Sequence, residues 1–259
     1  MDLKLKGKRA VVTGASKGIG RAIAEELAAE GVNVDIVARS GDLLSQMAEQ
    51  LSGRHRIEVR PFVIDLSDGA GQAALVAAVG TPDIFINNAG ESPPGEIDSF
   101  TDASWREAWE LKIFGYINLT RAMFAAMKAR GEGVIVNIIG TASEKMYPRY
   151  ISGSTGNSAL AAMTRSLGAR APDFGLRVLG VNPGFTATEQ AIAFLKRMSR
   201  STYGTEGRWQ DLVTEMRLPF GRMQEPAEVA RLVAFLSSPR AGYISGTVVT
   251  SDGGSIHRN

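Results

Sequence analysis

Residues 9–27 read RAVVTGASKGIGRAIAEEL: an apolar run of strand length, a glycine-rich turn and the start of a helical pattern. Gly14 permits a tight turn, Gly18 removes a side chain that would hold a pyrophosphate away, and Gly20 lets the helix pack closely. The first backbone amides of such a helix are unpaired and attract anionic oxygens. The turn could serve packing alone, but the strand before it and the helix after it favour a bound dinucleotide.

Apolar runs of strand length recur along the chain and alternate with helical patterns. Near-continuous hydrophobic strands separated by crossover helices are typical of a parallel sheet covered on both faces. The sequence therefore predicts an α/β fold of the Rossmann type, a doubly wound parallel sheet of seven strands with helices on both faces. The predicted strands are RAVVTGA (9–15), VNVDIVA (32–38), IEVRPFVID (57–65), DIFINNA (83–89), GVIVNII (133–139), LRVLGVNP (176–183) and GTVVTSDGG (246–254).

The length of 259 residues suits one large domain or two small ones. No linker, repeat or low-complexity segment divides the chain, so residues 1–259 are predicted to form a single domain. Apolar residues make up 44% and charged residues 22%, close to the globular average, which argues against disorder and against a membrane protein. No basic block stands out, and nucleic acid is not an expected partner.

The chain has no cysteine, which excludes disulfides and thiolate metal ligands, and no metal site is predicted. The N-terminus has no apolar segment before its first strand, and no run of about 18 apolar residues follows. A cytoplasmic location is therefore expected.

Cations follow the second predicted strand, where an NAD enzyme usually has a carboxylate for the ribose 2′-hydroxyl. Here Ala38 is followed by Arg39 and Ser40, and Lys17 in the glycine-rich turn brings a second cation to the same place. A guanidinium pairs strongly with a phosphate through charge-assisted hydrogen bonds. NADP(H) is therefore the predicted cofactor and NAD(H) the alternative, unless both cations are only solvated surface charges.

Five motifs follow one another in a fixed order: TGASKGIG (13–20), Asp65 after the third strand, NNAG (87–90), NPGFTAT (182–188) and SDGG (251–254). Together they resemble the short-chain dehydrogenase/reductase family, in its short single-domain form, over nearly all of the chain. The resemblance implies a seven-stranded Rossmann fold, a homotetramer or homodimer, and hydride transfer between a nicotinamide and a small-molecule carbonyl or alcohol.

The resemblance also implies roles for individual residues. Asp65 would bind the adenine amino group. The pyrophosphate and its ribose would be bound by Gly14, Ser16, Gly18, Ile19 and Gly20. The middle of the cofactor would lie against Asn88, Ala89 and Gly90. The nicotinamide end would be bound by Pro183, Gly184, Thr186 and Thr188.

The residues that carry the chemistry in this family are absent. The family reaction centre consists of an Asn, a Ser, a Tyr and a Lys, the last two spaced as YxxxK, with the Tyr as general acid or base. Set against that pattern, Gly153 stands at the Tyr position, Asn157 at the Lys position, Lys112 at the Asn position and Gly140 at the Ser position. No other register restores the pair, because no tyrosine in the chain has a lysine four residues later.

One interpretation is a reductase with a rearranged reaction centre. Lys112 and Asn157 would still supply one ammonium and one amide, with the family positions exchanged. Lys112 belongs to an apolar stripe of its predicted helix, from which it could reach the space left by the missing Tyr. Tyr150, three residues before Gly153 and so about 4.5 Å away along a helix, would supply the phenol.

Tyr147 is the second choice for that phenol, and Thr141 or Ser154 could donate a hydrogen bond to a carbonyl oxygen. Each candidate also has an ordinary explanation. Lys112 could lie at a subunit interface, Tyr150 could be a surface tyrosine, and Asn157 could bond only the backbone.

Two further interpretations involve no hydride transfer. The chain could be a catalytically silent NADP(H)-binding protein, such as a sensor or an assembly partner. It could also be a non-redox enzyme, a dehydratase, isomerase or cyclase, in which Gly140 and Gly153 leave room for a bulkier ligand.

The longest connection without a clear pattern, about residues 185–225, follows the motif expected to meet the nicotinamide. Because it carries aromatic residues among polar ones, residues 185–222 are predicted to cap the substrate pocket. The segments 105–127 and 152–170 are apolar over more than one stripe, which predicts burial against another subunit.

Overall fold

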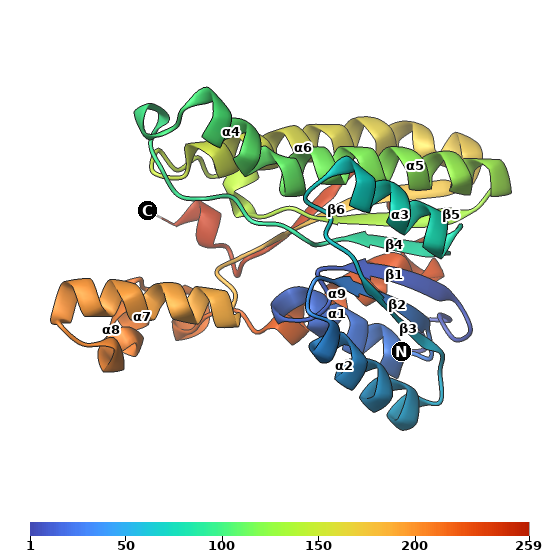
Figure 1. Ribbon diagram of the computed structural model, residues 1–259, viewed down its shortest axis with the longest axis horizontal. Helices are drawn as coiled ribbons and strands as arrows, with labels where there is room; N and C mark the ends of the chain where they lie inside the picture. The colour runs from blue at the N-terminus through green and yellow to red at the C-terminus, as the bar shows by residue number, and fades with distance from the viewer. Residues whose placement is uncertain (259) are drawn as a thin grey trace.

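A computed structural model of the protein describes residues 1–258, and within them lies one seven-stranded parallel sheet (Figure 1). The strands are β1 (Arg9–Thr13), β2 (Asn33–Ala38), β3 (Val59–Val63), β4 (Ile84–Asn87), β5 (Gly133–Ile138), β6 (Leu176–Pro183) and β7 (Val248–Ser251). Their spatial order is β3-β2-β1-β4-β5-β6-β7. The order reverses between β1 and β4, which is where such sheets bind ligands. The predicted fold class is confirmed.

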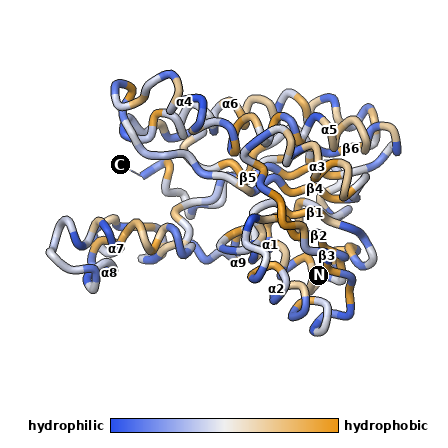
Figure 2. Tube along the Cα trace, viewed as in Figure 1, coloured by the Kyte–Doolittle hydropathy of each residue, from blue (hydrophilic) through white to orange (hydrophobic). Residues whose placement is uncertain are grey.

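Helices cover both faces of the sheet (Figure 1). On one face, α1 (Gly18–Ala29), α2 (Gly41–His55) and α9 (Pro226–Ser237) share a hydrophobic core with the strands. On the other, α3 (Gly69–Val79), α5 (Gly115–Arg130) and α6 (Ile151–Arg170) pack over the same strands. Hydrophobic residues are concentrated along the strands between these layers (Figure 2). Burial on both sides explains why the strands read as continuous apolar runs.

The helix α4 (Asp102–Trp109) does not continue directly into α5. One π-helical turn, Glu110–Phe114, lies between them. Such turns are rare and frequently occur at functional sites. The turn changes the direction of its side chains relative to a regular helix, and Lys112 lies in it.

Residues 185–222 are mostly helical, so the expectation of an irregular connection was wrong. The segment contains α7 (Glu189–Tyr203) and α8 (Trp209–Glu215), which extend away from the sheet (Figure 1). Ala191, Leu195 and Met198 recur at helical spacing and pack in a small hydrophobic cluster around Leu212. The segment therefore has a core of its own.

No helix within residues 1–258 has the length and apolarity needed to cross a membrane. The same residues contain no group of three or more His, Cys, Asp or Glu side chains that could hold a metal ion.

Candidate active site

The three glycines of the glycine-rich turn have no room for side chains. Gly14 and Gly18 have φ values of +67° and +55°, which favour glycine. A Cβ on Gly20 would lie 2.2 Å from the carbonyl oxygen of Gly14. The side-chain amide of Asn88 donates a hydrogen bond to the carbonyl oxygen of Thr13 at 3.0 Å. The backbone amide of Asn88 donates to the hydroxyl of Thr13 at 2.9 Å. The ends of β1 and β4 are thus tied together beneath the turn.

A cleft of about 720 Å³ opens at this edge of the sheet, at the point where the strand order reverses. Most of the predicted cofactor residues line it: Gly14, Ser16, Lys17, Gly18, Ile19, Arg39, Ser40, Asp65, Asn88, Ala89, Gly90 and Thr188. Residues far apart in the sequence are therefore brought together as expected for one extended ligand.

Four predicted cofactor residues do not line this cleft. Gly20 is buried where α1 begins, beneath the turn. Pro183 ends β6, and Thr186 donates a hydrogen bond to the carbonyl oxygen of Gly184 at 2.9 Å. Gly184 itself lines a separate pocket of about 160 Å³.

Arg39 and Asp65 face each other at one end of the cleft, with Nη1 and Oδ2 3.9 Å apart. The backbone amide of Ser67 donates to Asp65 at 3.0 Å, and this hydrogen bond, aided by the charge of Arg39, lowers the pKa of Asp65. The Arg39 side chain is 73% exposed, so its guanidinium can turn toward a phosphate at the mouth of the cleft.

Further residues that the sequence did not predict also line the cleft. Glu91 and Leu111 line it, as do Glu189 and Gln190 in the first turn of α7. A Cβ on Gly18 would lie 3.0 Å from Cγ2 of Thr188, so α7 begins directly over the glycine-rich turn. Two of these residues could have been predicted from their position next to a motif, because Glu91 directly follows NNAG and Glu189 directly follows NPGFTAT.

Lys112 lies next to the cleft, behind Gly90. A Cβ on Gly90, which lines the cleft, would lie 2.9 Å from Cα of Lys112. The Lys112 ammonium donates hydrogen bonds to the carbonyl oxygens of Ile138 at 3.2 Å and Ile139 at 2.9 Å. It also lies 5.5 Å from the centre of the Tyr116 ring. Burial lowers the pKa of Lys112 from 10.5 to about 8, because the charged form loses hydration.

Tyr150 is the residue immediately before α6, so the helix does not include it. Its ring nevertheless folds back over the first turn. A Cβ on Gly153 would lie 2.0 Å from Cε1 and 2.1 Å from Cζ of Tyr150. The ring therefore occupies the volume that a side chain at residue 153 would need. Burial raises the pKa of the Tyr150 phenol, an effect that the nearby Ser92 opposes and Glu91 reinforces.

Asn157 lies one helical turn after Gly153 and is 4% exposed. A Cβ on Gly140 would lie 3.1 Å from Nδ2 of Asn157, so the amide lies against Gly140. Gly140 directly follows Ile139, whose carbonyl oxygen accepts from Lys112. The Lys112 ammonium and the Asn157 side-chain amide therefore contact two consecutive residues after β5, Ile139 and Gly140.

The remaining candidates differ in their surroundings. Thr141 follows Gly140 at the start of a short 3₁₀ turn and is partly exposed. The Ser154 hydroxyl accepts from the backbone amide of Tyr147 at 3.1 Å, which assigns it a structural role in the turn before α6. Tyr147 is 40% exposed. Burial, with a contribution from the charge of Asp252, raises the pKa of the Tyr147 phenol.

Residues 8–198 match the family model for short chain dehydrogenases. Galactitol 2-dehydrogenase (L-tagatose-forming) of Cereibacter sphaeroides is 32% identical over 254 residues, which cover 97% of this chain and 96% of that protein. The L-sorbose reductase of Gluconobacter frateurii, solved with NADPH and L-sorbose, has a TM-score of 0.93 and 30% identity, with 100% of both chains covered. A variant of actinorhodin polyketide ketoreductase, solved with NADPH, has a TM-score of 0.89 and 30% identity, covering 97% of this chain and 98% of its own.

Proposed function

This chain belongs to the short chain dehydrogenase family, and from that premise we propose that it is an NADP(H)-dependent oxidoreductase with a rearranged reaction centre. Its substrate is a small carbonyl compound or the corresponding alcohol. The observation that carries the proposal is the ring of Tyr150, which fills the space where Gly153 has no side chain. The phenol has moved by three residues in sequence while remaining over the same turn of α6.

The cleft fits a nicotinamide dinucleotide. Its glycine-rich turn lacks the side chains that would keep a pyrophosphate away, and the first amides of α1 point to the same place. Arg39, at the other end of the cleft, suits a 2′-phosphate, which favours NADP(H) over NAD(H). Two structural relatives were solved with NADPH, which supports the same choice. When bound, NADPH supplies a hydride to a carbonyl carbon.

Tyr150 would deliver a proton to the carbonyl oxygen while the carbonyl carbon receives the hydride, and the product is an alcohol. The resulting phenolate would take a proton from solvent before the next turnover. A buried phenol is a poor acid, so a positive charge near the oxygen is required. In this proposal Lys112 would supply that charge, and its ammonium is held in place by hydrogen bonds to two backbone carbonyls.

Asn157 and Thr141 would orient the substrate beside these two groups. Asn157 lies against Gly140, where a side chain would otherwise stand, and Thr141 is the next residue along the chain. The relatives named for galactitol and L-sorbose favour a polar substrate with an alcohol or keto group.

The segment 185–222 is part of the proposal as a lid over the substrate. The first turn of α7 already lies over the glycine-rich turn, which supports this role. We also propose a homodimer or homotetramer. Phe114, which ends the π-helical turn, and Ile117, in the first turn of α5, expose apolar side chains that a second copy would cover.

The proposal is tested with NADPH carrying deuterium on one C4 face, incubated with a panel of aldehydes, ketones and quinones. Deuterium in an alcohol product is the expected result. Tight NADPH binding without transfer to any member of the panel would instead favour a silent NADP(H)-binding protein or a non-redox enzyme.

A further inference from the structure

Four buried side-chain atoms have no hydrogen-bond partner within residues 1–258: Asn87 Oδ1, Ser92 Oγ, Asn157 Oδ1 and Ser237 Oγ. A buried polar atom without a partner reduces stability, so each of the four requires an explanation. Their positions in the fold separate them into two pairs.

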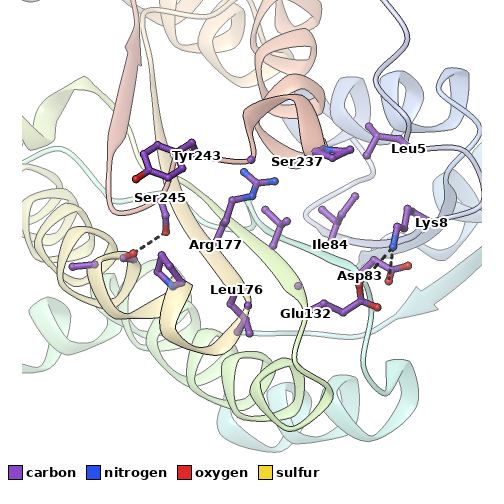
Figure 3. Close-up of a pocket in the computed structure, with 18 residues that line it drawn as sticks. Leu5, Lys8, Asp83, Ile84, Glu132, Leu176, Arg177, Ser237, Tyr243 and Ser245 are labelled. Atoms are coloured by element: carbon purple, nitrogen blue, oxygen red, sulfur yellow. Dashed lines mark hydrogen bonds and ion pairs between the residues drawn. The ribbon is translucent and has the colours of Figure 1, made fainter.

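The first pair is remote from the candidate reaction centre or already well bonded. Asn87 is fully buried, and its Nδ2 donates to Thr120 and Asn137, at 2.9 Å in each case. Ser237 ends α9 and lines a cavity of about 660 Å³ at the amino ends of β4, β5 and β6 (Figure 3). Ligands of parallel sheets bind at the opposite, carboxyl ends of the strands.

The second pair flanks the candidate reaction centre. Asn157 follows Gly153 by one turn on the same face of α6, and within residues 1–258 its side-chain amide makes no hydrogen bond. Ser92 is 7% exposed, and its side chain lies close enough to the Tyr150 phenol to lower the pKa of that phenol, while its buried Oγ has no partner within hydrogen-bond geometry. Asn157 Oδ1 and Ser92 Oγ can therefore each still accept a hydrogen bond from a ligand.

The chemical nature of the unpaired atoms limits which ligand groups can form hydrogen bonds with them. The unpaired atom of Asn157 is a carbonyl oxygen, which only accepts hydrogen bonds. A ketone or aldehyde group also only accepts, so it cannot pair with Asn157 Oδ1, and in the proposed function its oxygen already accepts from Tyr150. The partner of Asn157 Oδ1 must therefore be a donor elsewhere on the ligand.

We infer that the substrate carries a hydroxyl group on the carbon next to its carbonyl, and that Asn157 Oδ1 and Ser92 Oγ bind this hydroxyl. The substrate class is then α-hydroxy ketones and aldehydes, with vicinal diols as the reduced form. The inference rests on the proposed function and deepens it. A site with an acceptor for a hydroxyl discriminates against analogues that lack one, because the acceptor is then left buried and unpaired.

The test compares hydroxyacetone with butanone, a pair in which a hydroxyl replaces a methyl group of similar size. With NADPH, the wild type should favour hydroxyacetone by about 10- to 100-fold in kcat/KM. This ratio should fall toward 1 in Asn157→Leu, which has a similar volume without the acceptor, and should also fall in the milder variant Ser92→Ala. Ser237→Ala removes an equally buried hydroxyl at the other edge of the sheet and should keep the wild-type ratio.

Binding separates failure of this inference from failure of the proposed function. Equal kcat/KM for the two ketones would overturn the inference and leave hydride transfer intact. If neither ketone is reduced, thermal unfolding of the NADP⁺-loaded protein is measured with 1,2-propanediol. Stabilisation of the wild type and of Ser237→Ala, but not of Asn157→Leu or Ser92→Ala, would support the hydroxyl site without the redox reaction. No stabilisation of any of these proteins would overturn the inference, while the deuterium-transfer panel decides the proposed function independently.

Discussion

The ring of Tyr150 and a side chain at Gly153 would compete for the same space, since a Cβ on Gly153 would stand 2.0 Å from Cε1 of that ring. Atoms that are not bonded to each other do not approach so closely, so the ring can keep its place only while residue 153 is glycine. The position of the Tyr150 phenol therefore depends on the glycine at residue 153.

Gly153→Ala should displace the Tyr150 ring and lower kcat, by about 100-fold if the phenol is the general acid. The affinity for NADPH should stay close to wild type, because the cleft is not altered. Gly53→Ala is the matched control, since a Cβ at this glycine within α2 meets nothing within 4 Å. Steady-state kinetics and NADPH fluorescence titration check both variants, and unchanged kcat in Gly153→Ala would argue against a catalytic Tyr150.

Tyr150→Phe removes only the phenol oxygen and should lower kcat by about 100-fold or more. Tyr147→Phe makes the same chemical change at a residue that is 40% exposed, and should leave kcat near wild type. The two variants are compared by single-turnover reduction with NADPH. The reverse result would make Tyr147 the proton donor.

Lys112→Met should abolish turnover and change NADPH affinity by only a few-fold, while Lys128→Met on the exposed face of α5 should be active. Because the pKa of Lys112 is about 8, its ammonium is charged below that pH and neutral above it. The rate of carbonyl reduction in the wild type should therefore fall as the pH rises through about 8. Normal turnover in Lys112→Met would remove this residue from the mechanism.

The same pKa predicts how stability depends on pH. Folding lowers the pKa of Lys112 from 10.5 to about 8, so between these values the unfolded chain holds this proton and the folded chain does not. Stability rises with pH wherever the unfolded state binds more protons. The free energy of unfolding of the wild type, relative to Lys112→Met, should therefore increase from pH 8 to pH 10.5. Urea unfolding at several pH values measures this difference, and a constant or falling difference would contradict the lowered pKa.

Arg39→Ala should weaken NADPH binding by about 10- to 100-fold, because it removes hydrogen bonds from the guanidinium to the charged 2′-phosphate. NADH binding should hardly change, because NADH has no 2′-phosphate. Arg54→Ala, an exposed arginine near the far end of α2, removes the same charge away from the cleft. Equal losses for both nucleotides in Arg39→Ala would mean that Arg39 does not read the 2′-phosphate.

Local signals made the fold and the cleft predictable. The run RAVVTGASKGIG combines a buried strand with glycines that a tight turn requires, and both features depend only on neighbours in sequence. The predicted strand 246–254 is shorter in the structure, Val248–Ser251, and glycines with positive φ flank it on both sides, Gly246 before it and Gly253 and Gly254 after it. The helices within residues 185–225 could not be predicted from the pattern, because their apolar stripe is interrupted by polar residues and faces only a small separate core.

The sequence by itself determined the parallel sheet and predicted the dinucleotide cleft and an altered reaction centre, because those signals are residue types at fixed spacings. Only the tertiary structure decided where the candidate residues point. Tyr150 turns its ring over Gly153, Lys112 reaches the carbonyl oxygen of Ile139 from a π-helical turn, and Asn157 keeps an unpaired oxygen. The direction of a side chain and the partners of its polar atoms depend on contacts between segments distant in sequence, and periodicity along the chain carries no record of those contacts.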